Sequence, residues 1–149
     1  PATKRKKSED KDVVEAKPKP KKKLMNLDRT KMTKNQTIEI KNLYFEADVA
    51  TINNSSYDAL DEVYEFLEEN KDITIEIGGH TNGTPSHEYC DKLSEARAKK
   101  VAVYLVEQGI DGDRIYYKGY GKRKSIASNL TKEGRKKNQR VEIKILSIG

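Results

Sequence analysis

The chain has 149 residues, a net charge of +6 and a charged fraction of 36%. Residues 1–34 hold 13 Lys/Arg and 5 Asp/Glu, a net charge of +8, whereas residues 35–149 hold 17 and 19, a net charge of −2. A basic excess confined to one end argues against a nucleic-acid-binding domain, and no run approaches the ~20 apolar residues of a membrane-spanning helix.

Residues 1–34 are predicted to form a disordered basic linker. They include the basic runs 4–7 and 17–23, the second of which alternates Lys with Pro, and they contain too few apolar residues to bury a core. A contact with anionic lipid or another acidic surface is the alternative interpretation. Residues 35–149 are predicted to be the folded domain.

The first half of this domain is predicted to form a strand, a helix and a second strand. Alternating apolar residues indicate a strand over 37–45, with a bulge at Asn42 where the alternation shifts phase. After a loop over 46–54, Ser55 is expected to cap a helix, with Asp58 completing a capping box. Alternation over 73–77 indicates the second strand. The predicted buried stripe of the helix is Tyr57, Leu60, Val63, Tyr64 and Leu67.

A glycine-rich turn over 78–83 leads into the longest predicted helix, over 88–108, which Gly109 is expected to end. Arg97 lies along the apolar face of this helix, four residues from Leu93 and four from Val101. A guanidinium keeps its charge when it is buried, so Arg97 requires an anionic partner, either inside the protein or on a ligand. The predicted apolar stripe is Tyr89, Leu93, Ala96, Val101, Tyr104 and Leu105.

The remaining elements complete an α/β domain. A strand over 114–118, a loop over 119–130, a short helix over 132–137 and a last strand over 140–146 are predicted in this order. The strands alternate rather than being apolar throughout, which indicates helices on one sheet face and water on the other. The prediction is a two-layer sandwich of about four strands in a mixed sheet, with two main helices on one face.

His80, His87 and Cys90 are the candidates for metal binding or nucleophilic chemistry. Their spacing matches no strong metal signature, and no third group that would orient a nucleophile and a base is evident. We therefore predict no metal site, no cofactor and no enzymatic activity.

From about residue 38 to 146 the chain resembles the OmpA-like C-terminal domain, the peptidoglycan-binding module shared by OmpA, Pal and MotB. The resemblance is carried by Gly79-His80-Thr81-Asn82, Leu93-Ser94-Glu95-Ala96-Arg97-Ala98, Gly119-Tyr120-Gly121 and Asn138-Gln139-Arg140-Val141-Glu142. The Tyr89-Cys90-Asp91 variant is similar to OmpA-like domains of Bacteroidetes envelope proteins.

The resemblance implies non-covalent binding of the peptidoglycan stem peptide, in a cleft that grips its diaminopimelate residue. The family's arginine, here Arg97, is expected to hold a diaminopimelate carboxylate. Other ligand contacts are expected from Asp48, Val49 and Ala50 and from Thr84. The family also implies a periplasmic, outer-membrane-associated location as part of a larger envelope chain or complex, without nucleic acid as a partner.

The chain departs from the family pattern at Asn82, where most members have an aspartate that answers the ligand ammonium. A neutral amide makes an ordinary hydrogen bond, about half as strong as a charge-assisted one. Asp91 is our first candidate to restore the charge, and Glu88 and Asp48 are further candidates. The alternative is that Asn82 marks a scaffold domain that has lost its ligand and binds a partner envelope protein.

Further basic residues lie outside these motifs. The runs 122–124 and 135–137 are interpreted as solvated surface, with electrostatic attraction of anionic stem peptides as the alternative. Arg140 either faces the ligand or has a structural role, and we favour the structural role.

Overall fold

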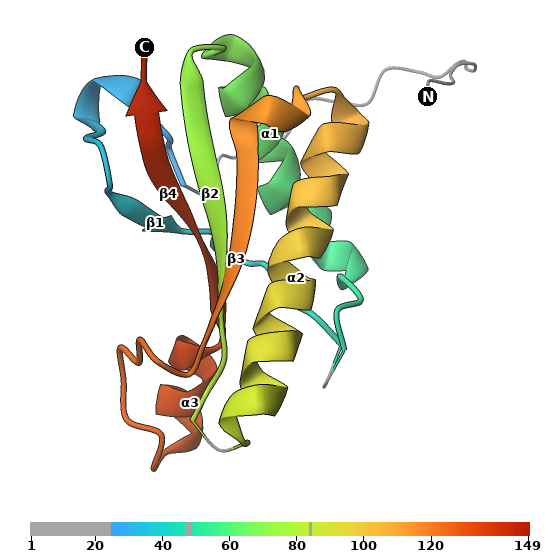
Figure 1. Cartoon of the computed structure of the whole chain (residues 1–149), viewed down its shortest axis with the longest axis vertical. Coiled ribbons are helices and arrows are strands. Elements are labelled where there is room, and N and C mark those ends of the chain that lie inside the picture. Colours follow the sequence, from blue (N-terminus) through green and yellow to red (C-terminus); the bar gives the residue numbers. More distant parts are fainter. Residues whose placement is uncertain (1–24, 47–48, 84) are drawn as a thin grey trace.

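The computed structural model describes residues 25–46, 49–83 and 85–149 (Figure 1). These residues form a four-stranded sheet, two long helices and one short helix. The strands are β1 (Thr37–Glu39), β2 (Ile73–His80), β3 (Ile115–Gly121) and β4 (Arg140–Ile148), and the helices are α1 (Tyr57–Glu69), α2 (His87–Gln108) and α3 (Lys132–Asn138).

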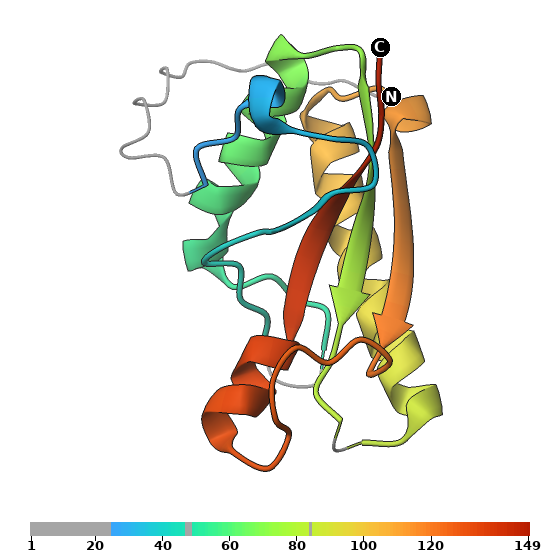
Figure 2. The same ribbon diagram turned by 90° about the vertical axis from the view of Figure 1, so that its left-hand side faces the viewer.

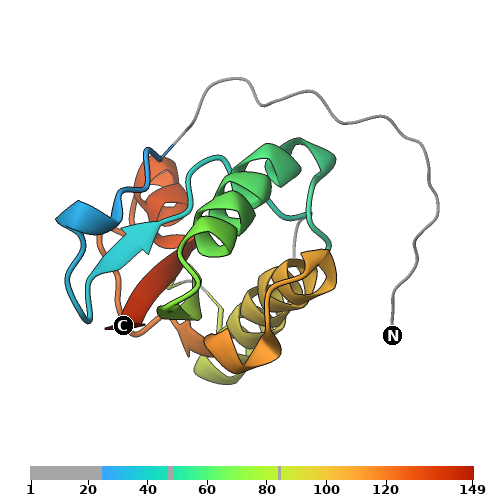
Figure 3. The same ribbon diagram turned by 90° about the horizontal axis from the view of Figure 1, so that it is seen from above.

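The strand order in the sheet is β1-β4-β2-β3. β4 runs antiparallel to both of its neighbours, whereas β2 and β3 are parallel and are connected through α2. α1 and α2 lie side by side on one face of the sheet (Figure 3). The predicted α/β class is confirmed, with a mixed four-stranded sheet and two main helices on one face.

The core lies between these helices and the sheet. In α1 the predicted stripe is confirmed at its centre, where the apolar side chains are fully buried, and Tyr57 and Tyr64 at its edges are half-buried. The alternation predicted for β4 is also confirmed. The buried side chains at the centre of the core are Leu60, Val63, Leu67, Ile75, Ile77, Val101, Leu105, Val141, Ile143 and Ile145.

The first strand is shorter than predicted. β1 ends at Glu39, and the chain then turns at Asn42, whose φ of 59° lies in the left-handed region that asparagine tolerates better than most residues. Phe45 makes only an isolated bridge with Ile52. The phase shift at Asn42 therefore marks the end of a strand, and the predicted bulge is wrong.

The start of α1 also differs from the prediction. Ser55 belongs to a short 3-10 turn, Asn54–Ser56, whose first residues are capped by the side chain of Asn53. Ser56 precedes α1 without capping it, because its hydroxyl accepts from the amide of Tyr44 (2.7 Å) and donates to the same residue's carbonyl oxygen (3.1 Å). Ser56 thus holds the loop after β1. Ser55 lies one residue too early to cap α1, so the capping box predicted for Ser55 and Asp58 is not formed.

The alternation of the strands predicted that the second face of the sheet is exposed to water. The structure shows that this face is partly covered. Near the end of β2 and the start of β4, the segment between β3 and α3 covers it (Figure 2). His80 and Arg140 point to this side and are only 4% and 7% exposed. Arg140 donates to the carbonyl oxygens of Lys124 (2.9 Å) and Asn138 (3.1 Å), which supports a structural role, and it also lines the pocket described below.

The predicted boundary between linker and domain at residue 34 is wrong for residues 25–34, while residues 1–24 of the predicted linker lie outside the described residues. Met25, Leu27 and Met32 pack against the core. The amides of Met25 and Asn26 donate to Glu62 of α1 at 2.9 and 3.0 Å. Arg29 forms a two-pronged ion pair with Asp72 at the start of β2. The folded domain therefore includes residues 25–34.

We expect a chain beginning at residue 35 to be less stable than one beginning at residue 25. The shorter chain loses three partly buried apolar side chains, which corresponds to about 2–4 kcal/mol of unfolding free energy. Urea denaturation of the two chains measures the difference. Arg29→Ala is the control, and its effect should be small because the ion pair is solvent-exposed. Equal stability of both chains would show that this segment is dispensable.

Candidate ligand-binding site around Arg97

The N-terminal half of α2 lies directly on the backbone of the sheet. A Cβ on Gly79 of β2 would be 2.2 Å from the carbonyl oxygen of Ser94, and one on Gly119 of β3 would be 2.5 Å from the amide of Glu95. The Ser94 hydroxyl also accepts from the amide of Gly121 at 2.9 Å. Glycine is therefore required at both strand positions for the helix to approach this closely.

This close approach explains why the predicted stripe of α2 is wrong at two positions. Tyr89 and Ala96 are exposed, whereas the small residues Cys90, Ser94 and Ala98 face the strands and are fully buried. The helical periodicity of the sequence predicts which large apolar side chains are buried. Here, however, α2 contacts the backbone of β2 and β3, so only small side chains fit between them. Arg97 is on the buried side of the helix as predicted, with 7% exposure.

Arg97 connects α2 to the loop that follows β1. Its Nε donates to the carbonyl oxygen of Val49 at 2.9 Å, and its Nη2 donates to that of Glu46 at 3.1 Å. Its guanidinium carbon lies 4.9 Å from the centroid of the Phe45 ring, a cation–π distance. These two hydrogen bonds to backbone carbonyl oxygens fix the orientation of the guanidinium.

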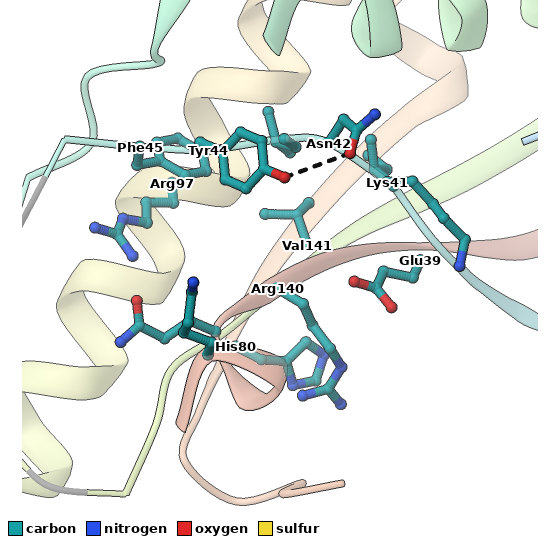
Figure 4. A pocket seen from close by; sticks show the side chains of 13 residues that line it. Glu39, Lys41, Asn42, Tyr44, Phe45, His80, Arg97, Arg140 and Val141 are labelled. Atoms are coloured by element: carbon teal, nitrogen blue, oxygen red, sulfur yellow. Dashed lines mark hydrogen bonds between the residues drawn. The ribbon is translucent and has the colours of Figure 1, made fainter. Parts of the chain in front are cut away.

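Arg97 also lines a pocket of about 360 Å³ (Figure 4). Figure 4 shows Arg97 beside Phe45 at one side of the pocket and His80 beside Arg140 at the other. Tyr44, which is 54% exposed, also contributes to the wall. The pocket thus offers a fixed positive charge, aromatic surface and polar side chains.

Glu142 fixes the positions of His80 and Arg140, the polar side chains on one side of the pocket. This carboxylate lies 2.7 Å from the Arg140 Nε and 3.3 Å from the His80 Nε2. Hydrogen bonds from His80 and from Arg140 lower the pKa of Glu142 from 4.5 to about 2, against the opposing effect of partial burial. His80 also stacks on the ring of Tyr120 at 5.1 Å. His80 is therefore a structural side chain in this arrangement.

The predicted ligand residues Asn82 and Asp91 lie at the turn between β2 and α2. The Asn82 carbonyl oxygen is 3.6 Å from the Sγ of Cys90, which is fully buried. Asp91 forms a two-pronged ion pair with Arg123, and this contact lowers the pKa of Asp91 and raises the pKa of Arg123. The carboxylate proposed to answer a ligand ammonium thus already has a cationic partner.

The other predicted contacts are divided between two sides of Arg97. Val49 is 45% exposed and meets Arg97 through its backbone. Ala50 is half-buried and lines a separate groove of about 370 Å³ with Ala96 and Val103 of α2. Asp48 and Thr84 lie outside the described residues.

Sequence reasoning missed the part played by the segment between β3 and α3. The Asn129 side chain accepts from the amide of Gly83 at 3.0 Å, and the Lys122 ammonium donates to the carbonyl oxygen of Pro85 at 2.6 Å. Together with the ion pair of Arg123, these contacts hold the glycine turn. No local pattern could have predicted them, because each joins residues more than 30 positions apart.

Neither a metal-binding cluster nor a membrane-spanning helix is found among the described residues. They contain no group of three or more His, Cys, Asp and Glu side chains that could hold a metal ion. Within the same ranges no helix is long and apolar enough to cross a membrane.

Comparison with known proteins identifies the family. Residues 44–139 match the OmpA family, and this range includes the glycine turn, α2 and α3. The chain belongs to the OmpA family. It is 43% identical over 103 residues to outer membrane protein A of Bordetella avium, covering 69% of this chain and 53% of that protein. This confirms the resemblance to the OmpA-like domain family.

Two further relatives of this OmpA-family chain show the range of proteins that carry the domain. Peptidoglycan-binding protein ArfA of Mycobacterium tuberculosis is 43% identical over 99 residues, covering 66% of this chain and 30% of ArfA. The cell wall anchor of the T6SS from Pseudomonas aeruginosa superposes with a TM-score of 0.63 at 29% identity, covering 73% of this chain and 78% of that one. The chain spans about half or less of the length of the two curated relatives.

We expect Gly79→Ala to destabilise this OmpA-family domain by at least about 1–3 kcal/mol, because the new methyl group would collide with the backbone of α2. Thermal unfolding measures the loss. Gly112→Ala is the matched control, since nothing lies within 4 Å of its Cβ position. If both variants melt at the same temperature, the helix does not lie as close to the strand as described.

Glu142 should contribute stability that depends on pH. Because its pKa is lowered on folding, the contribution is present above pH 4.5 and is lost as the pH falls towards 2, with an upper limit of about 3 kcal/mol. Wild type should therefore exceed Glu142→Gln in unfolding free energy at neutral pH, and the difference should shrink below pH 4.5. Glu88→Gln, whose side chain is 80% exposed, is the control. A difference that stays constant with pH would contradict the ion-pair network.

Proposed function

We propose that this domain binds the stem peptide of peptidoglycan non-covalently and anchors a larger envelope protein to the cell wall in the periplasm. The observation that carries the proposal is the buried Arg97, whose guanidinium two loop carbonyl oxygens orient beside a pocket. A forked guanidinium in a sheltered position is suited to a carboxylate. The similarity to peptidoglycan-binding protein ArfA and to the T6SS cell wall anchor supports a wall ligand.

The finer part of the proposal is that the carboxylate belongs to diaminopimelate. This residue carries an ammonium and a carboxylate at the end of its side chain, so it needs an anion beside the cation of Arg97. The turn from β2 offers Asn82 as a neutral acceptor, and Asp91 offers a charge that is shared with Arg123. Binding therefore requires either an ordinary hydrogen bond to Asn82 or a partial release of Asp91 from Arg123.

A binding role rather than catalysis is supported by the state of the one cysteine. Cys90 is fully buried, and the contacts described for its Sγ are the carbonyl oxygens of Asn82 and Pro85 at 3.6 and 3.8 Å. A carbonyl oxygen cannot take the thiol proton, so this arrangement does not activate a nucleophile.

The second candidate is a scaffold domain that binds a partner envelope protein and no wall peptide. It is favoured by Asn82, which lacks the charge expected opposite an ammonium, and by the ion pair that occupies Asp91. Sedimentation with purified sacculi separates the candidates. Co-sedimentation supports wall binding, a protein that stays in solution supports the scaffold, and release of soluble fragments would indicate an enzyme.

Arg97→Ala should lower the affinity for a diaminopimelate tripeptide at least about 30-fold, which corresponds to about 2 kcal/mol. Calorimetry measures this. Because Arg97 also holds the loop after β1, its removal alters the protein as well as the contact. A tripeptide with lysine in place of diaminopimelate provides the control, since lysine lacks only the distal carboxylate. Wild type should bind this analogue weakly, and equal affinity for both peptides would contradict the proposed carboxylate contact.

The ammonium contact is tested with three variants at the turn. Asn82→Asp should tighten binding roughly three- to tenfold by adding a charge-assisted bond. If Asp91 answers the ammonium, Asp91→Asn should weaken binding, and Arg123→Ala should strengthen it by freeing the carboxylate. Binding that appears only in Asn82→Asp would favour the scaffold reading of the natural chain. No response to any of the three would show that the ammonium is held elsewhere.

A further inference from the structure

Two large apolar side chains are exposed in the segment between β3 and α3. Leu130 is 91% exposed and Ile126 is 58% exposed, the two highest values among the large apolar side chains of the described residues. The backbone around them is fixed. The amides of Ile126 and Ala127 donate to the side chain of Asn138 at 2.7 and 3.0 Å, and that of Leu130 donates to the Ser128 hydroxyl at 3.0 Å. The exposure therefore belongs to an ordered turn.

Basic side chains surround these two residues. Residues 122–137, which we call the basic end, contain seven Lys/Arg and one acidic residue. This segment forms the end of the molecule that lies away from the C-terminus (Figures 1 and 2). The exposed basic side chains are Arg123, Lys124, Lys132, Lys136 and Lys137.

The charge of the rest of the domain has the opposite sign. Residues 57–72, which comprise α1 and the turn after it, contain seven acidic residues and one basic residue. α1 lies in the other half of the molecule from α3 (Figure 2). An anionic surface would thus attract the basic end and repel the helix at the far side, which gives the domain one preferred orientation.

We propose that the basic end docks on an anionic phospholipid bilayer, with Leu130 and Ile126 entering the headgroup region. Anionic stem peptides would account for the lysines and arginines, but they offer nothing to two exposed aliphatic side chains. A bilayer offers anionic phosphates at its surface and an apolar layer directly beneath, which matches both features at once. This contact does not involve Arg97. Lys136 of the basic end lines the pocket beside Arg97, and Arg123 pairs with Asp91, so the tests below leave both residues unchanged.

The natural absence of tryptophan provides a direct test in the full chain. In Leu130→Trp the single indole should shift its emission to shorter wavelength when vesicles of phosphatidylcholine and phosphatidylglycerol are added. Pure phosphatidylcholine vesicles should produce a much smaller shift. Tyr116→Trp, at a position 55% exposed on β3, is the matched control and should not shift. The basic N-terminal residues could bring the protein to the vesicle by themselves, but they would not place residue 130 in the headgroup region.

Charge reversal tests the electrostatic half of the proposal. Lys132→Glu combined with Lys137→Glu should reduce partitioning onto the anionic vesicles at least about tenfold, because each lysine near such a surface contributes substantially to binding. Lys99→Glu combined with Lys100→Glu makes the same change in net charge on α2 and should have a much smaller effect. Circular dichroism confirms that both variants are folded.

The outcomes distinguish the proposal from its alternatives. Arg97→Ala should partition onto vesicles like wild type, so loss of wall binding and loss of lipid binding can be told apart. An unshifted indole at position 130, or equal losses in the two charge-reversed variants, would overturn the proposal. If the basic end instead governs sedimentation with sacculi and has no effect on vesicles, its partner is the wall.

Discussion

The contact between α2 and the backbone of β2 and β3 determines where the candidate site lies. Because Gly79 and Gly119 have no side chains, Ser94 rests directly on the strands. Arg97 follows three residues later on the same side of the helix, so its height above the sheet is set by that contact. The loop after β1 then meets the guanidinium with its backbone carbonyl oxygens. A bulkier residue at either glycine would lift the helix and separate the arginine from this loop.

Sequence reasoning succeeded where local spacing carries the information. The buried centre of α1 and the alternation of β4 were predicted, and Arg97 was singled out because it is a charge on an apolar face. Sequence reasoning failed where backbone contacts or residues distant in the sequence determine the burial or the partner of a side chain. Ala96 is exposed because the helix contacts glycine backbone, and the carbonyl of Glu46 and the pairing of Asp91 with Arg123 leave no local trace in the sequence. The family resemblance supplied candidate ligand residues that spacing alone could not, and these stay predictions.

The segment between β3 and α3 links the two surfaces for which we propose ligands. Arg123 pairs with Asp91 on α2, and Asn129 and Lys122 hold the glycine turn at Gly83 and Pro85. The same segment presents the exposed basic and apolar side chains. A ligand that displaces this segment would therefore also alter the surroundings of Asn82 and Asp91.

The N-terminal segment has a mechanical consequence. Residues 25–34 are hydrogen-bonded to Glu62 of α1 and ion-paired with Asp72, just before β2. The amide of Gly149 donates a hydrogen bond to the carbonyl oxygen of the same Asp72. The glycine turn and α3 lie at the opposite end of the sheet (Figure 1). Tension between a chain attached before residue 25 and a ligand held near the turn would run along the strands. When force acts parallel to the strands, the hydrogen bonds between neighbouring strands are loaded together and share the force. This arrangement favours mechanical resistance of the domain along the strand direction.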